Sequence, residues 1–339
     1  MAIEILKAGP LCTVQDNGRT GYQALGYQES GAMDKYAMYS ANILAGNTES
    51  YRREAVLECT LTGITARFDT ASVIALTGAD MRPAINGKEV PRYATLFVRA
   101  GDTLTMGTAV KGLRCYLAVY GGISVPAVMG SRSTGLKTRM GGLGGRALRA
   151  GDRLLTGRNG HESEMLKHRI RREFRGVSPL SDGWEWLRGE APPRRFSGSE
   201  SITLLRVVQG PQEEAFTPEG IETFLRGVYT LTPDCNRMAL KLDGPAVATY
   251  KGSDILSDGI VEGSVQISSK GMPILMTADH QTTGGYAKIG TVVRADLPAA
   301  AQLKPGDRVG FRFVTPEAGI LAWRNAFFEL EKLKERIRK

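Results

Sequence analysis

A short phrase, Gly-Asp followed by Thr or Arg and then Leu or Val, occurs three times in this chain. The copies are Gly101-Asp102-Thr103-Leu104, Gly151-Asp152-Arg153-Leu154 and Gly306-Asp307-Arg308-Val309. In each copy Gly-Asp predicts a tight turn, and the residues that follow are typical of a strand. Because the phrase closes similar stretches in both halves of the chain, we predict two related β-rich units, residues 1–157 and 201–314.

Composition supports a mainly β chain with many turns. Glycine accounts for 41 of the 339 residues, well above the ~7% that is usual in proteins. Segments 71–77 and 113–120 are rich in β-branched or aromatic residues and are expected to be strands. Asn86-Gly87 predicts a two-residue hairpin turn, because Asn followed by Gly readily adopts the positive φ angles of a type I′ turn.

Only a few helices are expected. Residues 33–44 carry apolar side chains at helical spacing. Residues 315–339 predict a C-terminal amphipathic helix that begins with a threonine N-cap and a proline at the first helical position. Between the two units, residues 158–200 hold a basic run, two tryptophans and a Pro-Pro pair. We predict a basic linker there, with one short helix at most.

Charge and hydropathy exclude several classes of protein. The net charge is +9, but the basic residues are spread out except in 166–175, where no aromatic-interleaved motif accompanies them. A solvated linker or an acidic partner is therefore favoured over nucleic acid. No apolar run approaches the ~18 residues of a membrane helix. The first residues do not resemble a signal peptide, so a cytoplasmic protein is expected.

Metal and disulfide chemistry are not expected either. The four cysteines lie far apart and form no C-x-x-C pair. We therefore interpret them as buried thiols of a reducing compartment. Three histidines, two of them in one charged stretch, do not favour a zinc site.

The densest group of polar residues and glycines spans residues 277–288, directly after the apolar run 273–276. Its Asp, Gln, Thr and Tyr side chains offer acid-base and hydrogen-bonding groups. Gly284 and Gly285 allow backbone amides to approach a ligand closely. A long loop that merely connects two strands would have the same composition, so both interpretations stay open at this point.

Two further segments carry clusters of polar residues. Asp16, Arg19 and Asp34 can form either a structural ion-pair cluster, which the residues slightly favour, or an anion site. The segment 130–138 nearly matches the phosphate-binding P-loop pattern, but Leu136 displaces the lysine by one position. We therefore do not interpret it as a P-loop. The chain has no G-x-S-x-G nucleophile elbow.

Together these segments resemble one known family. The motifs that carry the resemblance are Val14–Tyr22, Ser30–Asp34, Gly130–Thr134, Gly145-Arg146, Gly151-Asp152 and Asp279–Tyr286, in this order. They are similar to those of the biotin-dependent carboxyltransferase group, also called allophanate hydrolase subunit 2. The group includes the KipA and PxpC proteins, the latter being the C-type component of prokaryotic 5-oxoprolinase. The resemblance covers residues 3–315.

The resemblance implies two cyclophilin-like β-barrel units and a multi-subunit hydrolase. The implied activity is the ATP-dependent opening of 5-oxo-L-proline, a small-molecule substrate, to L-glutamate. The implied partners are a KipI- or PxpB-like B subunit and a PxpA-like A subunit, with which ATP would be shared. The chain has neither a Met-Lys-Met biotin acceptor nor an ATP-grasp signature. Any biotin would therefore be on a separate chain.

Two alternatives follow from the same resemblance. The chain can be half of a biotin-dependent carboxyltransferase that acts on a urea-like amide. It can also be a KipA-like antagonist of a KipI-type kinase inhibitor, without catalysis. Two positions depart from the family pattern: Ala287 stands where proline is common, and His280 stands where arginine is frequent.

Site residues are expected in all three segments. Arg19, Arg132 and Lys288 would supply positive charge, while Asp279 would position the substrate or remove a proton. The residues expected to be catalytic are Asp279, Gln281, Thr282, Tyr286 and Arg19. Those expected to bind substrate or nucleotide are Asp16, Asp34, Arg132, Ser133, Thr283, Gly284, Gly285 and Lys288, with no metal ligand.

Overall fold

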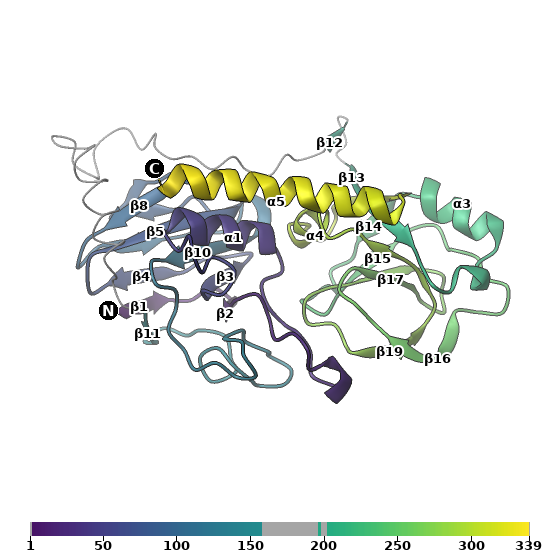
Figure 1. Ribbon diagram of the computed structural model, residues 1–339, viewed down its shortest axis with the longest axis horizontal. Coiled ribbons are helices and arrows are strands. Elements are labelled where there is room, and N and C mark those ends of the chain that lie inside the picture. The colour runs from purple at the N-terminus through teal and green to yellow at the C-terminus, as the bar shows by residue number, and fades with distance from the viewer. Residues whose placement is uncertain (1, 158–195, 198–201, 339) are drawn as a thin grey trace. The chain divides into compact units, whose positions relative to one another are not determined.

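The computed structural model describes residues 2–157, 196–197 and 202–338, and these residues form a mainly β protein, as expected (Figure 1). Two compact units divide the chain. Among the described residues, the first unit holds 2–19, 34–157 and 329–338, and the second holds 20–33, 196–197 and 202–328. Apart from 196–197, the expected linker 158–200 lies outside the described residues.

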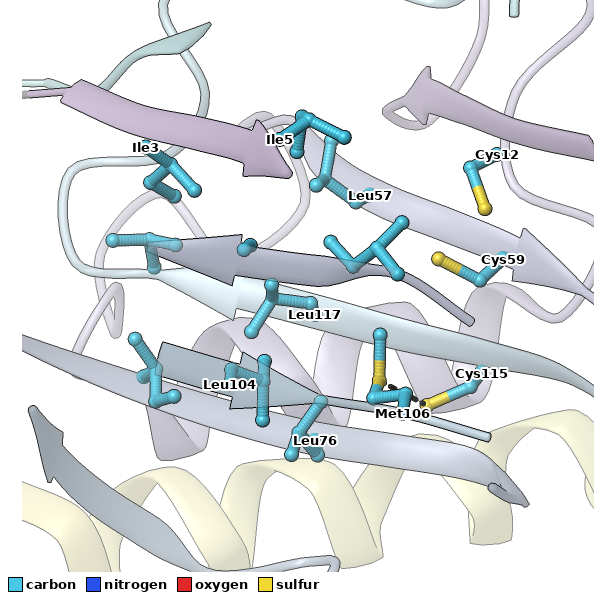
Figure 2. Close-up of a cluster of buried hydrophobic side chains, with 14 of the residues drawn as sticks. Ile3, Ile5, Cys12, Leu57, Cys59, Leu76, Leu104, Met106, Cys115 and Leu117 are labelled. Atoms are coloured by element: carbon cyan, nitrogen blue, oxygen red, sulfur yellow. Dashed lines mark hydrogen bonds between the residues drawn. The ribbon is translucent and has the colours of Figure 1, made fainter. Parts of the chain in front are cut away.

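The first unit consists of two antiparallel sheets around one core. Their strand orders are β11-β1-β4-β9-β6-β7 and β2-β3-β10-β5-β8. Figure 2 shows Ile3, Leu57 and Leu104, from strands of both sheets, in one buried cluster. The elements are β1 (Ala2–Lys7), β2 (Leu11–Gln15), α1 (Lys35–Leu44), β3 (Val56–Thr60), β4 (Thr65–Phe68), β5 (Ser72–Asp80), β6 (Ala84–Ile85), β7 (Lys88–Glu89), β8 (Thr95–Val98), β9 (Thr103–Thr105), β10 (Lys111–Val119) and β11 (Arg153–Leu155).

The second unit contains a closed seven-stranded barrel. Its order is β13-β20-β17-β18-β15-β14-β21, and β21 pairs in parallel with β13 to close the ring. A separate two-stranded sheet joins β16 and β19. The elements are η1 (Gln23–Leu25), β12 (Phe196–Ser197), β13 (Ile202–Gln209), η2 (Glu213–Ala215), α3 (Pro218–Arg226), β14 (Tyr229–Leu231), β15 (Ala239–Asp243), β16 (Asp254–Gly259), β17 (Ser264–Ile267), β18 (Pro273–Met276), β19 (Thr283–Tyr286), β20 (Lys288–Val292), α4 (Leu297–Ala301) and β21 (Arg308–Phe313).

The expected pair of barrels is thus seen as a closed ring in the second unit only. In the first unit the described strands of the two sheets do not pair with each other, and side chains from both sheets share one buried core. The cyclophilin-like character of either unit stays a prediction.

The three Gly-Asp phrases form the same turn. Gly101, Gly151 and Gly306 have φ angles of 89°, 88° and 91°, which glycine adopts without steric cost. In each turn the aspartate carboxylate accepts a hydrogen bond from the backbone N–H three residues earlier, at 2.7, 2.7 and 2.8 Å. Strands β9, β11 and β21 then begin one residue after the aspartate. The repeated phrase therefore encodes a repeated strand start, as predicted.

One of these turns carries a stabilising ion pair. Arg146 donates two hydrogen bonds of 2.7 Å to the carboxylate of Asp152 and lowers its pKa. A lowered folded-state pKa means that the pair stabilises the fold above the ordinary carboxylate pKa of ~3.9 and loses this effect as the pH falls.

We expect Asp152→Asn to lower the free energy of unfolding by about 1 kcal/mol at neutral pH, because the pair is partly screened by solvent. The difference should shrink as the pH falls from neutral to a value below the ordinary aspartate pKa, because protonation of the wild-type carboxylate removes the ion pair. Urea unfolding at both pH values measures it. Glu4→Gln, which removes a more exposed ion pair with Arg67 in the same unit, is the control. Equal effects of the two variants would contradict the prediction.

Other local expectations are confirmed. Ile85 pairs with Lys88 across Asn86-Gly87, whose φ angles of 50° and 80° are those of the predicted hairpin turn. The C-terminal helix α5 runs over Pro316–Arg338, and the Thr315 hydroxyl accepts from the backbone N–H of Ala318 at 3.3 Å. No helix in the described ranges is both long and apolar enough to cross a membrane.

The two observed units do not have the ranges 1–157 and 201–314 that the repeated phrase predicts. Residues 20–33, from the first half of the chain, belong to the second unit, and the last described residues, 329–338, belong to the first. Local sequence patterns do not show such exchanges, because they depend on contacts between segments that are distant in the chain.

Candidate functional site

The first group of expected site residues gathers around the carboxylate of Asp16, just after β2. This carboxylate accepts hydrogen bonds from the Ser131 hydroxyl at 2.7 Å, the Arg132 backbone N–H at 2.6 Å and the Ser133 hydroxyl. The backbone N–H of Gly18 donates a further bond of 2.9 Å. Asp16, Arg132 and Ser133 therefore lie together, as the prediction of a shared site requires. Their contacts also hold the loop at 131–133 in place.

Arg19 and Asp34 also make contacts within the first unit. The buried Arg19 guanidinium donates to the Ser133 carbonyl at 2.5 Å. Asp34 caps helix α1, because its carboxylate accepts from the backbone N–H of Ala37 at 2.8 Å. Of the two interpretations of this cluster, these contacts favour the structural one. A binding role for Arg19, Asp16 or Asp34 stays a prediction.

The second group lies in the second unit and is centred on Asp279, three residues after β18. Arg237 donates to both carboxylate oxygens, through Nε at 3.0 Å and Nη2 at 3.1 Å, and both side chains are buried. Nη2 also donates to the Gly31 carbonyl at 2.5 Å, and Gln28 donates to the Asp279 carbonyl. The segment 28–31 is thereby tied to the loop that the sequence singles out as the densest in polar groups.

His280 is almost completely buried beside this ion pair. Its Nδ1 lies 2.7 Å from the Gln281 carbonyl, an arrangement in which Nδ1 carries the proton and donates. Its Nε2 is buried and has no hydrogen-bond partner among the residues that the structure describes. The position at which the resemblance implies a frequent arginine therefore holds a buried imidazole here.

The remaining residues of this group lie on the two-stranded sheet and at the start of β20. Gly284 pairs with Asp258 in the ladder of β16 and β19. Lys288 donates to the Asp258 carboxylate and, at 2.8 Å, to the Gly259 carbonyl, and it lowers the pKa of Asp258. The partly or fully accessible members of the group are Gln281, Thr282, Thr283, Gly285 and Tyr286.

The structure thus places Asp16, Arg19, Arg132 and Ser133 in one group in the first unit and the expected residues from Asp279 to Lys288 in the second unit. Asp34 instead caps helix α1. The structure also adds residues that sequence reasoning missed, namely Arg237, Gln28 and Asp258. No motif spacing singles out Arg237, because its partners Gly31 and Asp279 are far away in the chain. Among the described residues, no cluster of three His, Cys, Asp or Glu side chains is placed to hold a metal ion.

Comparisons with known proteins agree with one another. The family model for the carboxyltransferase domain, subdomains A and B, matches residues 25–313. The C-type component of 5-oxoprolinase from Escherichia coli is 34% identical over 335 residues, which cover 99% of this chain and 98% of that protein. The protein of the same name from Haemophilus influenzae is 34% identical and covers 96% of each chain. The urea carboxylase of Kluyveromyces lactis is similar in structure, with a TM-score of 0.83 and 28% identity over 98% of this chain and 29% of that one.

Proposed function

The chain belongs to the carboxyltransferase domain family, subdomains A and B, and from this premise we propose that it is the C-type component of an ATP-dependent 5-oxoprolinase. In this proposal it hydrolyses 5-oxo-L-proline to L-glutamate in the cytoplasm together with A- and B-type subunits. The observation that carries the proposal is the match to two proteins named as the C-type component of 5-oxoprolinase, at 34% identity and over nearly the full length of each.

The chemistry of the proposed substrate explains which groups are needed. A lactam carbonyl is a poor electrophile, and ATP would activate its oxygen by phosphorylation. The protein must then stabilise negative charge on oxygen, hold a water molecule in line with the carbonyl carbon and supply a proton to the ring nitrogen. Backbone amides, cations and one carboxylate are suited to these tasks.

We assign these tasks to the loop from Asp279 to Tyr286. The two hydrogen bonds from Arg237 hold the Asp279 carboxylate in one orientation, from which it would accept a proton or orient the substrate. The partly accessible side chains of Gln281, Thr282 and Tyr286 would orient the lactam ring. Strand β19 pairs with β16 on one edge and with no other described strand. Because backbone groups alternate in direction along a strand and those of Thr282 and Gly284 face β16, the free edge supports a role in binding for the amide of Gly285.

Gly285→Ala tests the close approach of a ligand to this backbone. A Cβ atom at Gly285 would lie 3.4 Å from the Ile255 carbonyl and 3.9 Å from the Ser257 hydroxyl, which are ordinary contacts. The melting temperature should therefore stay unchanged. If a ligand lies against this glycine, the added methyl group would hold the ligand away from the amide and lengthen its hydrogen bond. We then expect kcat/KM for glutamate formation to fall by about tenfold or more.

Gly259→Ala, on the facing strand β16, is the matched control. A Cβ atom there meets no other atom within 4 Å, so both activity and melting temperature should stay as in the wild type. Full activity of Gly285→Ala would show that no ligand comes close to this glycine.

One experiment tests the proposed function as a whole. The chain is mixed with its A- and B-type partners, and glutamate release from 5-oxoproline is measured with and without ATP. We expect ATP-dependent glutamate only when all three proteins are present. Complete absence of ATP-dependent glutamate would refute the proposal.

A second candidate is favoured by the similarity to urea carboxylase. In that case the same loop would hold the ureido ring of biotin, carried on a separate chain, during carboxyl transfer to a urea-like amide. Avidin, which sequesters biotin, separates the two functions. It should leave 5-oxoproline hydrolysis unchanged and should abolish carboxyl transfer.

A further inference from the structure

Three of the four cysteines form a row across neighbouring strands of the first unit. Cys12 on β2 lies directly opposite Cys59 on β3, and Cys59 lies directly opposite Cys115 on β10. Directly opposed residues point to the same face of a sheet, and all three side chains belong to the buried core cluster. Figure 2 shows Cys12 and Cys59 facing each other, with Cys115 beside Met106.

The two pairs in this row are of different kinds. The carbonyls of Cys12 and Val14 accept hydrogen bonds from the backbone N–H groups of Leu148 and Thr134, which are not on β3. The backbone polar groups of Cys12 therefore point away from β3, and Cys12 and Cys59 are a non-hydrogen-bonded pair. Such pairs have the closer Cα atoms, typically ~4.5 Å apart, with side chains in closer approach.

Cys59 and Cys115 are the wider kind of pair. Backbone groups on a strand alternate in direction, so those of Cys59 point toward β10. Leu61 lies two residues after Cys59, Leu113 lies two residues before Cys115, and the Leu61 N–H donates to the Leu113 carbonyl. Residues two apart point the same way, so this bond agrees with a hydrogen-bonded pair at Cys59 and Cys115. Hydrogen-bonded pairs typically have Cα atoms ~5.5 Å apart. The Cys115 thiol donates to the Met106 sulfur at 3.9 Å, and the Cys12 thiol donates to the Thr62 carbonyl at 3.7 Å.

The thiol pKa values also distinguish Cys12, in the close pair, from Cys115, in the wide pair. Contact with the Cys59 thiol lowers the pKa of Cys12, which favours the nucleophilic thiolate. Burial raises the pKa of Cys115 to about 12, which keeps this thiol protonated. Cys12 also lies on the edge strand β2 of its sheet, beside loop residues rather than a further strand. A small oxidant therefore reaches Cys12 by a smaller local opening than Cys115 requires.

We propose that Cys12 and Cys59 are a redox-active pair, which a hydroperoxide oxidises to a reversible intramolecular disulfide. The Cys12 thiolate attacks one peroxide oxygen, the O–O bond breaks, and a sulfenic acid forms. The other oxygen leaves as hydroxide when the oxidant is hydrogen peroxide and as an alkoxide when it is an organic hydroperoxide. The Cys59 sulfur then attacks the Cys12 sulfur, the S–O bond breaks, and water leaves. The cysteine pair gives up two electrons and two protons, and hydrogen peroxide, for example, is reduced to two water molecules.

The test uses the full chain, fully reduced and then treated with hydrogen peroxide. Free thiols are blocked by alkylation in denaturant, and the peptides are mapped by mass spectrometry. We expect a peptide linked through Cys12 and Cys59, with Cys115 and Cys235 alkylated, and full reversal by dithiothreitol. Circular dichroism of the oxidised protein should show the native fold, so that the disulfide reports on the folded state.

Two variants make the outcome specific. Cys115→Ala should still form the linked peptide, whereas Cys59→Ala should not. A disulfide that joins Cys59 to Cys115 would overturn the proposal. So would a wild-type protein that retains all four thiols at a peroxide concentration sufficient to oxidise an exposed model thiol. The wild-type peptide map decides by itself if Cys59→Ala fails to fold.

Discussion

Arg237→Met should be among the most destabilising single substitutions in the second unit. It removes the partner of a buried carboxylate and leaves the Gly31 carbonyl without this donor. Breaking a buried ion pair from one side costs about 3–5 kcal/mol, because the remaining charge stays desolvated and uncompensated. Urea unfolding followed by circular dichroism measures the loss.

The double variant Arg237→Met with Asp279→Leu is the sharper comparison. Replacing both partners of a buried ion pair with apolar side chains is often neutral or even stabilising. We therefore expect most of the lost stability to return. If the double variant is as unstable as the single one, the contribution of Arg237 to stability does not come from its ion pair with Asp279.

The double variant also separates folding from function. A change at Asp279 alone removes a proposed functional group and breaks an ion pair, so lost activity would have two explanations. In the stable double variant only the functional explanation remains. We expect it to fold, to bind the partner subunits and to release no glutamate above background.

Gly141→Ala should have the second large effect, in the loop that holds the Asp16 group. Gly141 has a φ angle of +64°, and a Cβ atom there would lie 2.1 Å from the Ser133 carbonyl oxygen and 2.8 Å from Arg19 Nη2. A left-handed backbone costs a residue with a Cβ atom about 1–2 kcal/mol. Displacing the Ser133 carbonyl adds an overpacking cost of about 1–3 kcal/mol. Together these costs predict a loss of about 3 kcal/mol in the free energy of unfolding.

Gly144→Ala is the matched control in the same loop. Its φ angle is +66°, but a Cβ atom there meets nothing within 4 Å. The free energy of unfolding should therefore fall only by the cost of the left-handed backbone, about 1 kcal/mol. Chemical unfolding of both variants gives the comparison directly. Equal losses would mean that the close approach of Gly141 to Ser133 and Arg19 does not contribute.

Features encoded by neighbouring residues could be predicted from the sequence. The Gly-Asp turns, the Asn86-Gly87 hairpin and the cap of α5 each depend on a few adjacent residues whose conformational preferences act locally. The apolar run 273–276 is strand β18, and the polar loop that begins at its end contains Asp279, as predicted. Part of that loop is itself a strand, β19, because Thr283–Tyr286 pairs with β16, which lies far earlier in the chain.

Features that depend on long-range contacts could not be predicted. Arg237 contacts Asp279 and Gly31, and neither separation follows a motif. The exchange of residues 20–33 into the second unit is of the same kind. The sequence singled out Asp16 and Ser133 as residues that could bind a ligand, but it could not show that they bind each other.

The central claim is that this chain completes an ATP-dependent 5-oxoprolinase, and coupled product formation tests it most directly. ADP and glutamate are quantified in one reaction that contains 5-oxoproline, ATP and the A- and B-type subunits, with or without this chain. The proposal predicts that, with the chain present, ADP and glutamate appear together in equal amounts, and that without it glutamate is absent. Glutamate formation at the same rate without this chain, or none with it, would contradict the proposal.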